Sequence, residues 1–234
     1  MLRLAWCSPF PPERSGIADY SVELIEAITE HELAEVALFV NDSAVFNAPS
    51  LNHLDRFPIE TLGEKRFEFD LPIYQMGNHI IHQKIVEQAI KLPGITVLHE
   101  FELNAFMTQQ TLGQQHPARY FRELIYATPS ADFSKSSALA FPDLHRLSSL
   151  LPFNQRLLDQ SIGLVAHSQY VADLISNSQT TTSDIKVIRQ LGKLSEPADA
   201  MIQDRGENKT LFACAGQITP EKQIDKVLDA SADQ

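Results

Sequence analysis

The sequence is poor in cysteine and has no long apolar run, and these two absences narrow the class of protein. Only two cysteines occur among 234 residues, Cys7 and Cys214, and both fall in apolar runs typical of buried strands. We therefore expect no disulfide and a reducing, cytoplasmic setting. Residues 1–6 lack the basic start and apolar core of a signal peptide, and no window reaches the length of a membrane span.

Glycine and positive charge are also scarce. Only one glycine, Gly16, follows the first apolar run, so the three-glycine fingerprint of dinucleotide-binding proteins is missing and NAD is not expected. Lys and Arg number 19 against 30 Asp and Glu, which gives a formal net charge of −11. This charge disfavours nucleic acid as a partner. Any phosphate site must therefore be local, built from backbone N–H groups and one or two cations.

Short apolar runs alternate with longer segments of helical period, which predicts an α/β fold. We expect a Rossmann-like parallel sheet with helices on both faces. The expected strands are residues 2–6, 36–40, 69–75, 96–99, 163–166 and 185–188. Ile17, Tyr20, Leu24 and Ile28 recur at helical spacing and predict the buried face of a helix after the first strand. Residues 41–66 and 128–143 lack periodicity, so irregular connections are expected there.

The domain organisation follows from a change of composition near residue 191. Residues 1–191 predict one Rossmann-like domain, and residues 192–209 lose apolar period and gain charge, as linkers do. Residues 210–215 then read as a fresh strand, followed by a helix that Pro220 opens. We expect residues 210–234 to be the start of an incomplete second Rossmann domain.

Polar residues and glycines follow several of the expected strands. Ser15 and Gly16 precede a helix whose N–H groups suit an anion or a hydroxyl, although a plain turn explains them equally well. Gly77 and Asn78 follow the third strand, at the edge where parallel sheets bind ligands. His79 and His82 are three residues apart; a metal pair is disfavoured there because cysteine and a clear third ligand are absent.

Two further strands end in histidine. His99 and Glu100 end the fourth strand, where a histidine can accept a proton or hold a hydroxyl, although it is more often structural. Ser168 follows His167 and suits a helix N-cap. Gly216 and Lys222 sit at the start of the second unit, where a lysine near a helix N-terminus suits a diphosphate, or is simply solvated.

Taken in order along the chain, these segments resemble the retaining glycosyltransferases of group 1, or family four, which have two facing Rossmann domains (the GT-B fold). The resemblance runs from about residue 6 to residue 231 and rests on five segments, PPERSGIADYS, YQMGN, PGITVLHE, LVAHSQYVADLI and FACAGQITPEKQIDKVLDA. Each segment alone is unspecific, and their collinear order carries the likeness.

The resemblance implies roles for individual residues. Ser15 and Gly16 would lie against the acceptor and the donor phosphates, and His99 would contact the transferred sugar. Glu100 stands where the family usually has aspartate. We therefore take His99 and Glu100 as the candidate catalytic residues.

The remaining candidates bind substrate or donor. They are Ser15, Gly16, Gly77, Asn78, His82 and Ser168 for the substrate, and Gly216 and Lys222 for the donor diphosphate. No metal and no cofactor is expected, because the nucleotide diphosphate sugar is a co-substrate.

The expected activity is transfer of a hexose from a nucleotide diphosphate sugar to a glycan or lipid-linked acceptor with retention. The family's glutamate pair, which holds the ribose and the sugar, has no counterpart up to Gln234, so we expect the chain alone to be nearly inactive. One alternative is a non-catalytic subunit that supplies the acceptor surface to a separate C-terminal half. A nucleotide-sugar epimerase is the less favoured alternative.

Residues 119–126 leave a question of membrane contact open. Arg119 and Arg122 beside Tyr120, Phe121 and Ile125 fit a helix at a membrane surface, as in peripheral enzymes with lipid-linked acceptors. An amphipathic helix that packs on the core explains the same residues and is favoured.

Overall fold

A computed structural model describes residues 1–42, 45–127, 151–178, 183–190 and 223–232. The chain divides into two compact units, Met1–Lys193 and Leu194–Gln234. In the second unit the described residues form one helix, α8 (Ile224–Ala232). The expected linker, the strand at residues 210–215, Gly216 and Lys222 lie outside the described residues, as does the expected connection at residues 128–143.

The first unit is built on a seven-stranded sheet in which every neighbouring pair is parallel, with the order β3-β2-β1-β4-β5-β6-β7. The strands are β1 (Arg3–Cys7), β2 (Glu35–Val40), β3 (Arg56–Pro58), β4 (Leu71–Met76), β5 (Ile95–Leu98), β6 (Gly163–Ala166) and β7 (Asp184–Val187). The expected Rossmann-like parallel sheet is therefore confirmed.

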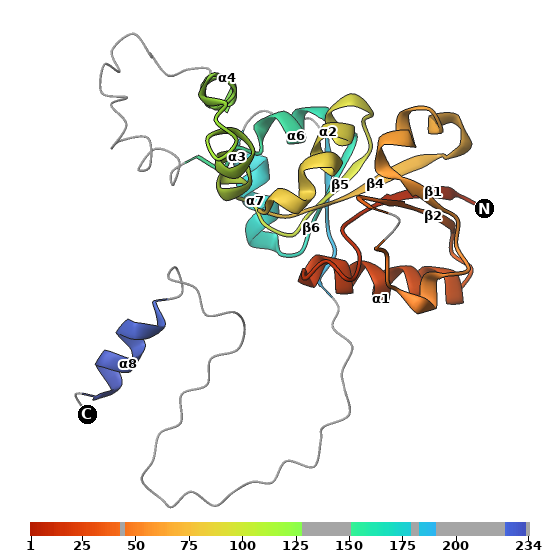
Figure 1. Ribbon diagram of the computed structural model, residues 1–234, viewed down its shortest axis with the longest axis horizontal. Coiled ribbons are helices and arrows are strands. Elements are labelled where there is room, and N and C mark those ends of the chain that lie inside the picture. The colour runs from red at the N-terminus through yellow and green to blue at the C-terminus, as the bar shows by residue number, and fades with distance from the viewer. Residues whose placement is uncertain (43–44, 128–150, 179–182, 191–222, 233–234) are drawn as a thin grey trace, which may run out of the picture. The chain divides into compact units, whose positions relative to one another are not determined.

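Helices cover both faces of this sheet (Figure 1). The α-helices of the first unit are α1 (Gly16–Glu30), α2 (Gln83–Lys91), α3 (Asn104–Thr111), α4 (Pro117–Ala127), α6 (Gln155–Gln160) and α7 (Gln169–Asn177). Figure 1 shows α1 below the sheet, with α2 and α6 above it. Alternate residues of each strand feed two separate cores, so that Trp6 packs with Ile25 of α1 on one face and Cys7 packs with Ile85 of α2 on the other. Burial on both faces explains why the strands read as nearly continuous apolar runs.

The order of the strands sets where a ligand can bind. The chain runs from β1 outward to β2 and β3, then returns to the other side of β1 as β4. The direction of winding thus reverses between β1 and β4. Open parallel sheets bind ligands outside the carboxyl ends of their strands at such a switch point.

The expectation of an irregular segment at residues 41–66 was wrong. This segment contains the edge strand β3 and the 3-10 helices η1 (Pro49–Leu51) and η2 (Ile59–Gly63). The strand has three residues and ends in Pro58, which cannot donate to a sheet ladder, so neither length nor alternation marks it. The six strands expected between residues 2 and 188 are all present, and their ends differ from the expected ones by up to two residues.

The buried face of α1 also differs in part from the expectation. Tyr20 is buried as expected, whereas Leu24 and Ile28 are half-buried. Ala18, Ser21 and Ile25 are the fully buried residues, so the axis of the buried stripe is rotated by about one position. Within the described part of the chain, no helix is long and apolar enough to cross a membrane.

Candidate functional site

The candidate site lies where β1, β4, β5 and β6 end on one edge of the sheet. Gly77 follows β4, His99 follows β5 and His167 follows β6, while the turn after β1 leads into α1. We call this edge, with the first turns of α1, the rim. It is formed because parallel strands bring their carboxyl ends to the same side.

Two contacts join α1 to the strand ends. A Cβ atom on Gly77 would lie only 2.5 Å from Ile17 Cδ1, so the backbone after β4 passes directly against the first turn of α1. Tyr20, one turn further, lies edge-on to both histidine rings, with centroids 4.9 Å from His99 and 5.3 Å from His167. The turns after β1, β4, β5 and β6 therefore converge at α1, as the expected geometry requires.

His99 is neutral in this setting. Its Nε2 donates to Gln75 Oε1 at 2.8 Å, which leaves Nδ1 as a hydrogen-bond acceptor. Burial, with smaller contributions from His167 and His82, lowers the pKa of His99 to about 3. A histidine with so low a pKa is a weak base, but its neutral ring can still accept a hydrogen bond from a hydroxyl. The geometry therefore suits the holding of a ligand hydroxyl better than the removal of a proton.

Asn78 and Glu100 form a second polar group on the rim. Asn78 Oδ1 accepts from the Phe106 backbone N–H at 2.8 Å, and Nδ2 donates to Asn104 Oδ1 at 3.2 Å. Burial raises the pKa of Glu100, and hydrogen bonds from Asn78 partly offset that rise. Asn78 thus connects the turn after β4 to the start of α3, and most of the hydrogen-bonding capacity of its side chain is used within the protein.

His82 is buried behind Gly77, next to the end of β4. It is 1% exposed, and its Nδ1 donates to the backbone oxygen of Gln75 at 3.0 Å. Its Nε2 lies 2.9 Å from the place a Cβ on Gly77 would occupy. Burial is the main cause that lowers the pKa of His82 to about 4. A ligand-binding role for His82 stays a prediction; in the structure its ring packs behind Gly77.

His79 has a structural role at the start of a short helix. Its Nδ1 accepts from the Ile81 backbone N–H at 3.3 Å and caps the 3-10 helix η4 (Ile80–His82). Across the described ranges, no group of three or more His, Cys, Asp or Glu side chains is placed to hold a metal ion.

The two serines of the candidate site are both helix caps. Ser15 Oγ accepts from the Ile17 N–H at 3.2 Å at the start of α1, and Ser168 Oγ accepts from the Val171 N–H at 3.3 Å at the start of α7. The cap predicted for Ser168 is confirmed. At Gly16 a Cβ would meet nothing within 4 Å, so the protein's own packing does not require glycine there.

Three rim residues were not among the predicted site residues, namely Tyr20, Gln75 and His167. His167 Nδ1 donates to the Ile188 backbone oxygen at 2.8 Å, and its ring centroid lies 4.6 Å from that of His99. Its buried Nε2 has no hydrogen-bond partner, and neither has the buried Nε2 of Gln75. A glutamine inside an apolar strand was the available signal, because such a residue is seldom buried without a role.

Comparison of the sequence with known proteins identifies no family for this chain. No protein-family model matches the sequence, and no curated protein matches it.

Proposed function

We propose that this chain provides the acceptor-side half of a retaining glycosyltransferase that moves a hexose from a nucleotide diphosphate sugar to a glycan or lipid-linked acceptor. One observation carries the proposal: His99, neutral and fixed by Gln75, lies on the rim beside the switch point with Nδ1 as an acceptor. Its place after β5 is also the place that the resemblance gives to the sugar-contacting histidine.

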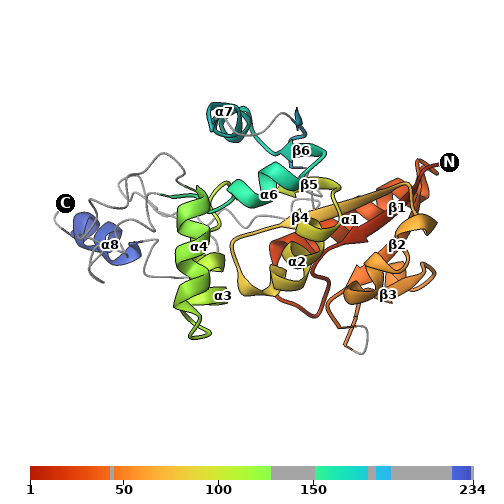
Figure 2. The same cartoon turned by 90° about the horizontal axis from the view of Figure 1, so that it is seen from above.

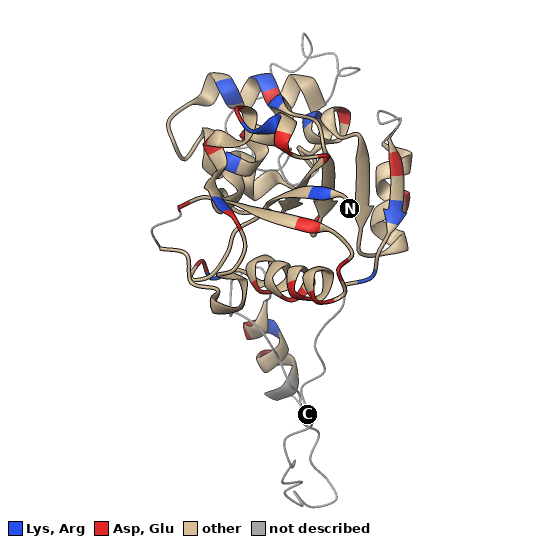
Figure 3. Cartoon of the chain, turned by 90° about the vertical axis from the view of Figure 1, so that its right-hand side faces the viewer, with Lys and Arg blue, Asp and Glu red and all other residues tan. Residues whose placement is uncertain are grey.

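The acidic charge of α1 supports a proposal in which the first unit binds the sugar and the second unit binds the diphosphate. α1 carries Asp19, Glu23, Glu26 and Glu30 and no Lys or Arg, and in Figure 3 its ribbon shows acidic segments without basic ones. Acidic residues near a helix N-terminus reduce its attraction for phosphate. In the proposal the sugar lies at the rim, while Gly216 and Lys222 hold the diphosphate.

The proposed reaction needs no protein nucleophile. The bond between the sugar's anomeric carbon and the phosphate oxygen breaks, the acceptor oxygen bonds to the same carbon on the same face, and the acceptor proton passes to the leaving phosphate. His99 accepts a hydrogen bond from a sugar hydroxyl, and Glu100 receives a second hydroxyl. Such positioning can supply most of the rate enhancement in reactions of this kind.

The test is binding of nucleotide sugars to the full chain, observed by saturation-transfer NMR with UDP-glucose, UDP-galactose, GDP-mannose and ADP-glucose. We expect saturation of hexose protons for at least one of the four. His99→Phe keeps a ring beside Tyr20 and His167 but removes both nitrogens, so it should abolish the hexose signal. His53→Phe makes the same change at an exposed histidine and should leave the signal unchanged.

Two outcomes would overturn the proposal. In the first, no nucleotide sugar gives a hexose signal; in the second, His99→Phe keeps the full signal while circular dichroism shows both variants folded. The same samples, incubated and examined for products, separate the alternatives. Epimerised donor would favour the epimerase. Hexose transferred to an added acceptor by the chain alone would show that the donor site does not depend on residues beyond those present, against the expectation of near inactivity.

A further inference from the structure

The strand β7 leaves one edge of the sheet open. It pairs with β6 on one side, and no strand in the described part of the chain pairs with its other side. Figure 2 shows the sheet running from β3 at one end to β6, next to α7, at the other. An open edge presents backbone N–H and C=O groups that can pair with a further strand.

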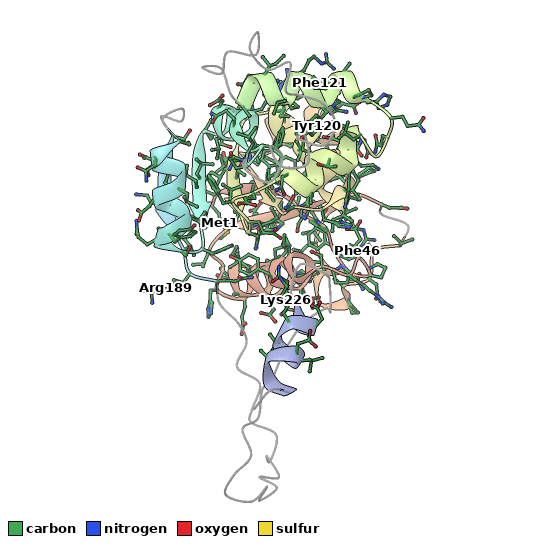
Figure 4. All side chains as sticks on the ribbon, turned by 90° about the vertical axis from the view of Figure 1, so that its left-hand side faces the viewer. Met1, Phe46, Tyr120, Phe121, Arg189 and Lys226 are labelled. Atoms are coloured by element: carbon green, nitrogen blue, oxygen red, sulfur yellow. The ribbon has the colours of Figure 1, made fainter. Side chains whose placement is uncertain are left out.

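The two edges of the sheet differ in how they are protected. The strand β3 has three residues, begins with Arg56 and ends in Pro58, and short, charged strands with proline discourage pairing. The strand β7 contains no proline, and its end carries exposed apolar side chains, Val187 at 40% and Ile188 at 50% exposure. In Figure 4, Arg189, two residues beyond β7, lies at the outer side of the first unit. The edge at β7 is therefore accessible.

The helix α4, the other candidate surface of the first unit, is largely covered on its apolar side. Tyr120 and Leu124 are each 1% exposed and belong to the core cluster, and Phe121 packs against it. Figure 4, which labels Tyr120 and Phe121, shows both on this helix. The face of α4 that a membrane would require is thus used by the core, and the edge at β7 is the stronger candidate for an interface.

Two residues of β7 direct their backbone groups to the open side. The Ile188 N–H donates to the backbone oxygen of Ala166 in β6 at 2.9 Å, so the even-numbered residues of this strand bond toward the sheet. Because these groups alternate in direction along a strand, those of Ile185 and Val187 point away from β6. A strand that arrives at this edge would therefore bond to Ile185 and Val187.

The side chains of β7 place two opposite charges on one face. Ile185 packs against the core cluster on the α2 side of the sheet, so Asp184 and Lys186 project from the other face. Both are exposed, and within the described residues neither forms an ion pair. A lysine on an edge strand normally discourages pairing. It stops doing so when the arriving strand places a carboxylate opposite the lysine.

We infer that β7 pairs with β7 of a second copy of this chain, antiparallel and centred on Ile185, so that the two sheets join into one. In this register Ile185 exchanges both backbone hydrogen bonds with Ile185 of the partner subunit. Asp184 then lies opposite Lys186 of the partner subunit, and the symmetry produces this pair twice. Residues next to a hydrogen-bonded pair have the closer side chains, so both ion pairs occupy favourable positions.

The charges select both the partner and the register. The order Asp-Ile-Lys is its own complement when it is reversed, so a second copy supplies the matching strand without further conditions. A register centred on Asp184 or on Lys186 would place like charges opposite each other, which is destabilising. One centred on Val187 would leave both charges unpaired. The interface is independent of the rim and of its proposed function.

Sedimentation of the full chain over a series of concentrations tests the pairing, and we expect an equilibrium of monomer and dimer. Lys186→Asp and Asp184→Lys each turn two attractive pairs into two repulsive ones, so each should raise the dissociation constant of the dimer about tenfold or more. An equimolar mixture of the two variants again places opposite charges face to face. It should form a heterodimer with the affinity of the unaltered chain.

A matched control and a backbone measurement locate the interface. Lys91→Asp makes the same change of charge at an exposed residue of α2 and should leave the dissociation constant unchanged. Hydrogen exchange followed by NMR should show the Ile185 and Val187 amides slowing as the concentration rises. The Lys186 amide, which points to β6 in monomer and dimer alike, should not change its rate with concentration.

Each contrary result overturns the inference, provided that circular dichroism shows the variants folded. A monomer at every concentration would do so, whether the edge stays free or takes a strand of another protein. A dimer that tolerates both charge reversals, or one in which the Ile185 and Val187 amides exchange as in the monomer, would be formed by another surface. A mixture of the two variants that stays monomeric would exclude the register centred on Ile185.

Discussion

The rim and the small cleft among α2, α3, α4 and α6 both contain buried polar groups, but at the rim more of these groups are bonded to the protein itself. At the rim, His82 bonds to the Gln75 backbone and Asn78 bonds to α3, so most polar atoms hold the protein's own turns in place. In the cleft, the buried Nε2 of Gln110 has no hydrogen-bond partner. We therefore expect most substitutions at the rim to change folding and binding together, whereas replacement of Gln110 should change stability alone.

The largest effect is expected from Gly77→Ala at the rim. The added Cβ would lie 2.5 Å from Ile17 Cδ1 and 2.9 Å from Nε2 of the buried His82 ring, so both side chains must give way, and the ring has little room to do so. We expect the free energy of unfolding to fall by about 3 kcal/mol, the upper part of the usual range for overpacking. Urea denaturation followed by circular dichroism measures this loss.

Gly16→Ala is the matched control, because its Cβ meets nothing within 4 Å and alanine favours the helix. Its free energy of unfolding should stay within about 0.5 kcal/mol of the unaltered chain. Equal losses for the two variants would show that the close contact between α1 and the turn after β4 does not hold the rim, and the contrast with the cleft would fail.

The next effect is a loss of stability in acid caused by His82. Its pKa in the folded chain, about 4, lies below the ordinary value of 6.5, so the unfolded chain binds the proton more tightly. The stability is therefore complete above pH 6.5 and is lost as the pH falls toward 4. By linkage, one such histidine contributes a loss of roughly 2 kcal/mol between pH 7 and pH 5.

His82→Asn tests this assignment, since the asparagine amide can still donate to the Gln75 backbone oxygen but does not titrate. The urea midpoint of the variant should fall less between pH 7 and pH 5 than that of the unaltered chain. His53→Asn, at an exposed histidine, should keep the original pH dependence. If both variants follow the unaltered chain, the acid sensitivity arises elsewhere, with His99 as the next group to examine.

The sheet could be predicted from the sequence because strands that are buried on both faces consist of nearly continuous apolar residues. Residues 163–166 match β6 at both ends, whereas most other ends moved by one or two residues because hydrogen-bonding partners, not hydropathy, decide where a strand stops. The strand β3 was not predicted because its three residues, which end in proline, are too few to show an alternation of apolar and polar side chains.

The rim was predicted only in part, for a related reason. His99 and Gly77 follow apolar runs, so their place at a sheet edge follows from topology alone. His167 meets His99 because β5 and β6 are neighbours, with Leu98 opposite Ala166, and Tyr20 reaches both rings from α1. Neither the neighbouring of β5 and β6 nor the packing of α1 can be predicted from hydropathy. The cleft had no signal at all, since Gln110 and Arg119 lie on separate helices and meet through tertiary packing.

The smallest effect expected at the rim concerns Ser15, where folding and ligand binding can be separated by one substitution. Ser15→Ala removes the bond to the Ile17 N–H and should cost about 1 kcal/mol of stability, as loss of an N-cap usually does. Ser15→Asp restores an acceptor for the cap, so its stability should return to that of the unaltered chain. The new carboxylate would nevertheless repel an anionic ligand at the start of α1.

If donor phosphates approach Ser15, as the resemblance implies, Ser15→Asp should bind nucleotide sugars several-fold more weakly than Ser15→Ala although it is the more stable of the two. Isothermal titration with the nucleotide sugar that gives the strongest hexose signal measures the difference. Equal affinities would remove the phosphates from this end of α1 and leave Ser15 as a cap alone. Ser15 would then act only as Ser168 does, as the N-cap of a helix, and Gly216 and Lys222 would remain the proposed contacts of the diphosphate.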